Sequence, residues 1–162
     1  MTIGLDPNEG LIKVRVHLLG SALESGYESE TLWAEDLGEQ RYRIWNLPVY
    51  AYNIGMRDIV ECAPDPEGGL PVVTRVLEQG DCFTVRLYFS AAASDSEIES
   101  VLGLLSERRV LFEKSDRLLW AIGLRSREDY DWIGTGLEPF ISSGSVALES
   151  AYQVAEPPVG AT

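Results

Sequence analysis

Few residue types able to carry out catalysis occur in this chain of 162 residues. His17 is the single histidine, and no G-x-S-x-G turn accompanies it as in serine hydrolases. Cys62 and Cys82 are far apart and form no C-x-x-C pair, so the usual zinc spacings are absent. The sequence also contains neither a P-loop nor a G-x-G-x-x-G turn. We therefore predict no catalytic residue, no metal and no cofactor, and favour a protein that is not an enzyme.

The remaining nucleophiles and acids have structural alternatives. Glu28 and Glu30 share one face of a predicted strand, an arrangement that could support acid–base chemistry. We favour the structural alternative, in which they pair across strands with Arg15, Arg41 or Arg43. Both cysteines lie among acidic residues that disfavour a thiolate, so we expect them to be small core residues.

The charge balance excludes several classes of partner. Thirteen Lys and Arg residues stand against 26 Asp and Glu, which gives a net charge of -13. Affinity for nucleic acid and for anionic membranes depends on basic residues, so we expect neither as a partner. No apolar run approaches the ~20 residues of a membrane span, and no secretory signal pattern opens the sequence. With only two cysteines, these features predict a cytoplasmic protein.

Residues 1–92 are expected to be mostly β. Residues 12–18 alternate between apolar and polar side chains, as in a half-buried strand. Further short strands are predicted at residues 27–34, 41–45, 58–62 and 70–77. Short strands with frequent turns and no helix signal predict a bent sheet or small β-barrel.

Residues 93–155, together with a strand at 83–89, are expected to mix helix and strand. Ser94 and Glu97 have the spacing of a capping box and begin a helix near 95–108. A second helix is predicted near 127–141, and its Gly134 and Gly136 suit close packing between helices. Strands at 110–113, 118–124 and 146–152 complete a βαββαβ order, which is ferredoxin-like. The fold class is therefore α+β, with residues 156–162 as a disordered tail.

Four spaced segments stand out along the chain. They are E-T-L-W-A-E at 30–35, Y-R-I-W-N-L-P at 42–48, G-M-R-D-I-V at 55–60 and G-D-C-F-T-V-R at 80–86. Through these segments, residues 11–152 resemble a bacterial family labelled only as domain of unknown function 4265. Two positions depart from the family pattern, since Arg57 replaces a usual glycine and Gln79 a usual serine. The resemblance implies a fold, and it implies no activity.

Six residues are the candidates for a ligand or partner site. They are Glu30, Trp33, Asn46, Tyr52, Asp58 and Arg86. A structural role is the alternative for each: Trp33 can pack at the rim of the barrel, Asn46 can bond its own backbone in a turn, and Asp58 can accept backbone N–H groups. Arg86 is placed to bind the carboxylate of Glu30 through two hydrogen bonds.

Two functional hypotheses follow. The first is a non-enzymatic protein-binding or regulatory module, such as an immunity protein, whose partner is basic because the chain is acidic. Exposed aromatic residues, for which Trp45, Tyr50 and Tyr52 are candidates, would anchor that partner unless they pack in the core. The second is a small-molecule-binding protein or enzyme with a site in the cleft between the two parts, using Glu30, Asp58 and Arg86.

Overall fold

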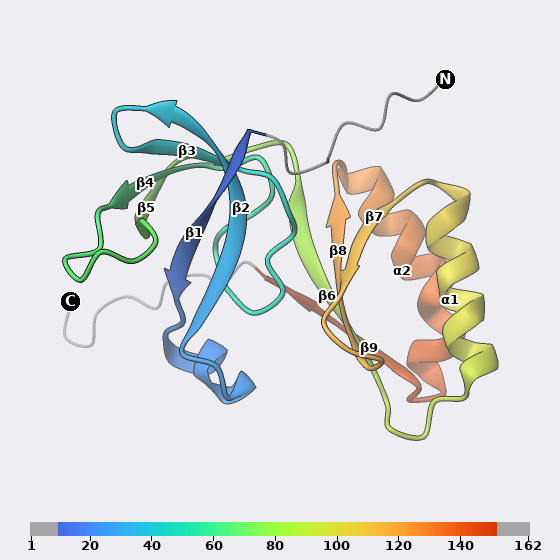
Figure 1. Ribbon diagram of the computed structural model, residues 1–162. Helices are drawn as coiled ribbons and strands as arrows, with labels where there is room; N and C mark the ends of the chain where they lie inside the picture. The colour runs from blue at the N-terminus through green and yellow to red at the C-terminus, as the bar shows by residue number, and fades with distance from the viewer. Residues whose placement is uncertain (1–9, 152–162) are drawn as a thin grey trace, which may run out of the picture.

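The computed structural model describes residues 10–151, which form a mixed α+β fold with two β-sheets (Figure 1). The first sheet contains β1 (Leu11–His17), β2 (Ser29–Gly38), β3 (Arg41–Ile44), β4 (Ile59–Ala63) and β5 (Val72–Glu78). Each strand pairs antiparallel with the next. A single parallel bridge between Arg15 and Val72 joins β1 to β5, so the sheet curls until its outer strands meet. The predicted bent sheet of short strands is therefore present.

The alternation predicted for β1 is observed. Val14 and Leu18 are buried in the core of the curved sheet, whereas His17 is exposed at the end of the strand. A short 3-10 helix, η1 (Gly20–Ser25), connects β1 to β2.

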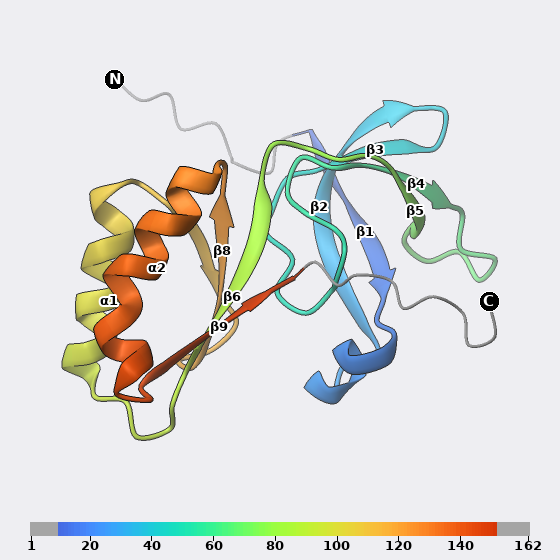
Figure 2. The same cartoon turned by 180° about the vertical axis from the view of Figure 1, so that it is seen from behind.

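The second sheet carries both helices on one face (Figures 1 and 2). It contains β6 (Phe83–Phe89), β7 (Leu111–Lys114), β8 (Leu119–Leu124) and β9 (Val146–Ser150) in the order β7-β8-β6-β9, with antiparallel neighbours. Helices α1 (Asp95–Glu107) and α2 (Arg127–Ser142) cover the face that points away from the curved sheet (Figures 1 and 2). Both helices begin and end within about one residue of the predicted bounds. The predicted tail at 156–162 lies outside the described residues.

Local sequence signals account for the helices. The capping box at Ser94 and Glu97 is formed in both directions. Gly136 allows the two helices to approach, because a Cβ atom there would lie 2.7 Å from the side chain of Leu104. The predicted close packing between helices is confirmed at Gly136 and is wrong at Gly134, where an added Cβ atom would have no neighbour within 4 Å.

The segment between β3 and β4, residues 45–58, lies between the two sheets (Figures 1 and 2). Leu47 and Val49 from this segment pack with Cys82 and Ala121 of the second half. Gly123 on β8 permits this approach, because a Cβ atom there would be 2.8 Å from the side chain of Leu47. The segment thus forms a layer of its own, and it positions the site described next.

Candidate binding site between the two sheets

Residues Val49, Tyr50 and Ala51, here called the linking segment, are held by charged side chains from both sheets. The Glu30 carboxylate on β2 accepts hydrogen bonds from all three backbone N–H groups, at 2.6, 3.0 and 2.8 Å. From the other sheet, Arg86 on β6 donates to the carbonyl oxygens of Val49 and Ala51. The linking segment, which has no secondary structure, therefore donates its N–H groups to a negative side chain and offers its carbonyl oxygens to a positive one.

The predicted pairing of Arg86 with Glu30 is wrong. The two side chains bind the same linking segment from different sides and do not bind each other. The carboxylate that does pair with Arg86 is Glu149, whose Oε1 lies 3.4 Å from the guanidinium. Tyr52 covers the guanidinium with its ring, 4.2 Å from the central carbon, and donates its hydroxyl hydrogen to Glu149. Arg86 is 1 % exposed, so these contacts replace its hydration.

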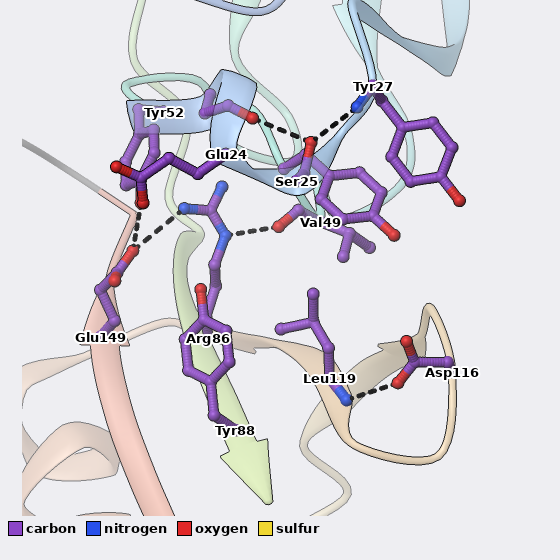
Figure 3. Close-up of a pocket in the computed structure, with 12 residues that line it drawn as sticks. Glu24, Ser25, Tyr27, Val49, Tyr52, Arg86, Tyr88, Asp116, Leu119 and Glu149 are labelled. Atoms are coloured by element: carbon purple, nitrogen blue, oxygen red, sulfur yellow. Dashed lines mark hydrogen bonds and ion pairs between the residues drawn. The ribbon is translucent and has the colours of Figure 1, made fainter. Parts of the chain in front are cut away.

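A pocket of about 420 Å³ opens beside Arg86. Residues of η1, the linking segment, β6, β9 and the turn between β7 and β8 enclose it. Its lining comprises Ala22, Glu24, Ser25, Tyr27, Val49, Tyr50, Tyr52, Arg86, Tyr88, Asp116, Leu119 and Glu149. Figure 3 shows Glu149 and Tyr52 meeting Arg86 at one side of the pocket, with Tyr27 and Asp116 at the other. The pocket lies in the cleft between the two sheets, where the second hypothesis expected a site.

The lining is rich in tyrosine and carries more acid than base. Three carboxylates line the pocket against one cation, Arg86. The rings of Tyr27 and Tyr50 contact each other at a centroid distance of 5.1 Å. Burial raises the pKa of Tyr88, and the carboxylate of Glu149 raises it further, so this phenol is neutral at physiological pH.

Of the six candidate residues, Tyr52 and Arg86 line this pocket, and Glu30 acts from behind the linking segment. Asn46 does not bond its own backbone, which corrects the predicted turn. Its Oδ1 accepts from the backbone N–H of Trp33 at 2.7 Å, and its side-chain nitrogen is 3.4 Å from Glu113. The ring of Trp33 lies under the ammonium group of Lys13, away from the pocket.

Asp58 is 1 % exposed and ties together two loops. It accepts backbone hydrogen bonds from Gly55 at 2.8 Å and from Gly80 at 2.7 Å. The sequence predicted that Asp58 accepts backbone N–H groups in this turn, and the bond from Gly55 agrees with that prediction. Burial raises the pKa of Asp58, although both hydrogen bonds act in the opposite direction. The residue does not line the pocket, and its contacts assign it a structural role.

Sequence reasoning missed Glu149 and Glu113. Glu149 could have been found from register, because antiparallel pairing of β6 with β9 places it directly opposite Arg86. Glu113 lies on the edge strand β7 and faces Asn46. Burial raises the pKa of Glu113, hydrogen bonds from Asn46 and the backbone lower it, and the charge of Glu30 raises it again.

The cysteines are buried and free, as expected. Burial raises the pKa of Cys62 to about 12, with a further contribution from Glu61. Burial also raises the pKa of Cys82. Between residues 10 and 151 no group of three or more His, Cys, Asp or Glu side chains is arranged to hold a metal ion. None of the helices in that range is long and apolar enough to cross a membrane.

Comparison with known families decides the relationship that the spaced segments suggested. The family model described as "Domain of unknown function (DUF4265)" matches residues 30–147, well over half of the chain. The chain belongs to this family. The DUF4265 match includes Glu30, Arg86, Glu113 and the whole linking segment, whereas Glu149 and η1 lie outside it.

A solved structure shares the fold of this DUF4265 protein. It is described as a novel crystal structure of a hypothetical protein from Neisseria gonorrhoeae, and it superposes with a TM-score of 0.70 at 14% sequence identity. The alignment covers 89% of this chain and 96% of that one. A comparison with curated proteins found no match.

The structure explains one departure from the DUF4265 pattern. Arg57 occupies the position where the resemblance implies glycine, and its φ of 72° lies in the left-handed region that favours glycine. Gly80 packs against the backbone of Arg57, and a Cβ atom on Gly80 would come within 2.6 Å of it. The left-handed backbone thus favours glycine at position 57, and the tight crossing of the two loops requires glycine at position 80.

Proposed function

We propose that the protein is a non-enzymatic, cytoplasmic binding module that holds a basic protein partner at η1 and the adjoining pocket. The observation that carries this proposal is a group of exposed apolar side chains beside an acidic pocket. Leu19 is 78 % exposed, Leu23 47 % and Tyr27 56 %, all within nine residues of the chain. Large apolar side chains left in water together are typical of an interaction surface.

Charge supports a basic partner. The chain carries a net charge of -13, and Glu24, Asp116 and Glu149 place three carboxylates at the pocket next to η1. A negative surface accelerates encounter with a positive one, while apolar and aromatic anchors supply most of the affinity after contact. Of the aromatic anchors suggested by sequence, Tyr50 and Tyr52 belong to the pocket wall, and Trp45 is 36 % exposed elsewhere.

The proposal is tested by cross-linking and mass spectrometry of complexes formed in the native host. We expect the wild type to capture a basic protein that is lost with the double variant Leu19→Ser, Leu23→Ser. Leu111→Ser is the matched control, because Leu111 on β7 is 43 % exposed and distant in sequence from η1. Capture that is insensitive to the η1 variant, or a partner as acidic as this chain, would refute the proposal.

Kinetics with the captured partner give a second test. Association should slow as salt is added, because added ions shorten the range of the attraction to ~3 Å at 1 M. An association rate that is unchanged by salt would contradict the electrostatic part of the proposal.

A small-molecule role is the second candidate. A pocket of about 420 Å³ between two sheets falls in the ~300–1,000 Å³ range of ligand sites. A biosynthetic gene cluster around the gene would favour this role, and a neighbouring toxin gene would favour the protein-binding role.

We also infer the finer architecture that goes with this function. The order β6-α1-β7-β8-α2-β9, with β6 and β8 central and both helices on one face, supports a ferredoxin-like part within residues 83–150. The bridge between β1 and β5 supports a small barrel within residues 11–78. The partner site would then lie at the junction of these two parts.

A further inference from the structure

The pocket beside Arg86 combines aromatic faces with carboxylates. Four tyrosines and three acidic residues contribute to its lining, together with a single basic side chain. The tyrosines come from separate parts of the chain: Tyr27 follows η1, Tyr50 and Tyr52 flank Ala51, and Tyr88 lies on β6. The fold thus gathers four rings around one cavity.

Arg86 does not make this pocket an anion site. Each of its three guanidinium nitrogens already has an acceptor, namely Val49 O, Ala51 O and the Glu149 carboxylate. The ring of Tyr52 covers a face of the same group, and the residue is 1 % exposed. An incoming anion would have to displace Glu149 and would face Glu24 and Asp116 as well.

The same lining favours a cation, because it combines aromatic faces with carboxylates. Aromatic faces attract ammonium groups through the ring quadrupole, most strongly where water is excluded. Glu24 is exposed at the pocket and makes no hydrogen bond or ion pair with another described residue, so its charge is available to a ligand. The tyrosine rings would surround the alkyl part of the ligand, and the carboxylates would face its charged end.

We infer that this pocket binds an alkylammonium group, supplied by a lysine side chain of the basic partner. The lysine as source rests on the function proposed above, whereas the alkylammonium chemistry follows from the pocket alone. The exposed Leu19 and Leu23 would then contact apolar residues that flank the lysine, because η1 borders the pocket through Ala22 and Glu24.

The chemistry is tested by titrating the full chain with n-butylammonium, 1-butanol and butyrate, which share a short alkyl chain and differ in charge. Tyrosine ring signals are followed by NMR. We expect n-butylammonium to shift the rings of Tyr52 and Tyr88, with about tenfold tighter binding than 1-butanol. Tyr130 on α2, which is 42 % exposed, should not respond. Equal binding of 1-butanol, or tighter binding of butyrate, would overturn the inference.

Two variants with different risks to folding sharpen the test. Glu24→Gln changes an exposed side chain and should weaken n-butylammonium binding severalfold while leaving thermal stability unchanged. Tyr88→Leu removes a ring from the wall and should weaken binding further. Tyr130→Leu is the control and should bind as the wild type does. Unchanged binding in the Glu24 and Tyr88 variants would overturn the inference.

The source of the ammonium group is tested with two peptides, acetyl-Gly-Leu-Lys-Leu-Gly-amide and the same peptide with norleucine in place of lysine. We expect the lysine peptide to bind about tenfold more tightly, and to lose this advantage in Tyr88→Leu. Equal affinities would overturn the lysine assignment. A host partner that depends on Leu19 and Leu23 but not on Tyr88 would overturn this inference and leave the proposed function standing. Binding of n-butylammonium without any host partner would instead defeat the proposed function.

Discussion

Strand β6 separates two interfaces of different chemistry. Its residues Val85, Leu87 and Phe89 belong to the apolar core beneath the helices. The alternate residues Thr84, Arg86 and Tyr88 carry polar groups, and Arg86 binds the linking segment on the side of the curved sheet. The comparison within one strand shows that the helix face is held by apolar packing, whereas the other face adds charged hydrogen bonds to the packing of Leu47 and Val49.

The difference has consequences for specificity. Apolar packing is non-directional, so the helix side tolerates many combinations of side chains of suitable volume. The junction with the curved sheet combines apolar packing with hydrogen bonds from Glu30 and Arg86 to three consecutive residues, and these directional bonds restrict the position of the backbone. Because that backbone carries Tyr50, and Tyr52 follows it, the charged contacts determine the shape of the pocket.

The largest effect is expected at the junction. Arg86→Met should lower the free energy of unfolding by about 3–5 kcal/mol, because the carbonyl oxygens of Val49 and Ala51 would lose their donors in a buried site. Urea denaturation followed by far-UV circular dichroism measures this. A loss below about 1 kcal/mol would show that the junction does not depend on Arg86.

Combining the Arg86 variant with a Glu30 variant tests whether the two side chains stabilise the protein jointly. Glu30→Gln and Arg86→Met should be non-additive, since both side chains hold the same three residues, and coupling energies of about 0.5–3 kcal/mol are typical of such contacts. Strict additivity would mean that the two contacts act independently.

A core substitution on the helix side should be slightly less costly on average. Leu137 is fully buried, so Leu137→Ala should lower the free energy of unfolding by about 2–5 kcal/mol through lost contacts and a cavity. It should leave n-butylammonium binding unchanged at temperatures where the variant is folded, because Leu137 does not line the pocket. A parallel loss of ligand affinity would show that the two faces are not separable.

Replacement of Arg57 should stabilise the protein. Arg57→Gly removes a left-handed backbone strain and a buried Nε without a hydrogen-bond partner, at the loss of an exposed ion pair with Asp81 at 3.9 Å. We expect a net gain of about 1 kcal/mol in calorimetry or urea denaturation. Arg109→Gly, at another left-handed residue after α1, is the comparison variant. A destabilised Arg57→Gly would show that the contacts of Arg57 outweigh the strain.

The smallest effect concerns pH. Burial raises the pKa of Glu113 above its ordinary 4.5, so the stability it contributes is present below that value and is lost as the pH rises through the folded-state pKa. Glu113→Gln should therefore be more stable than the wild type at neutral pH, and this advantage should shrink on acidification. Glu99→Gln, an exposed substitution on α1, should show no such trend in thermal melts at pH 7 and pH 5. An advantage that grows on acidification would contradict the assignment.

Local signals in the sequence predicted the helix side well. The capping box at Ser94 and Glu97 involves residues within one turn of each other, so it can be recognised without tertiary information. The helices are consequently found where the sequence places them.

The junction could not be predicted in the same way. Residues 45–58 have no periodicity that would reveal their place between the sheets, and the partners of Glu30 and Arg86 are backbone groups, which every residue offers. A pairing argument based on side-chain charge therefore led to the wrong partner. Glu149 was within reach of sequence reasoning, since only the register of two correctly predicted strands was needed to place it opposite Arg86.

The two buried thiols make separate reporters of local opening. Cys62 lies in the core of the curved sheet, and Cys82 packs against Leu47 and Val49 in the layer between the sheets. Neither thiol can react with an alkylating reagent until its surroundings open, and both pKa values are raised. Pulsed alkylation followed by peptide mass analysis would then time the exposure of each layer in a single sample, without any engineered label. The order in which Cys82 and Cys62 are alkylated thus shows whether the layer between the sheets opens before the curved sheet unfolds.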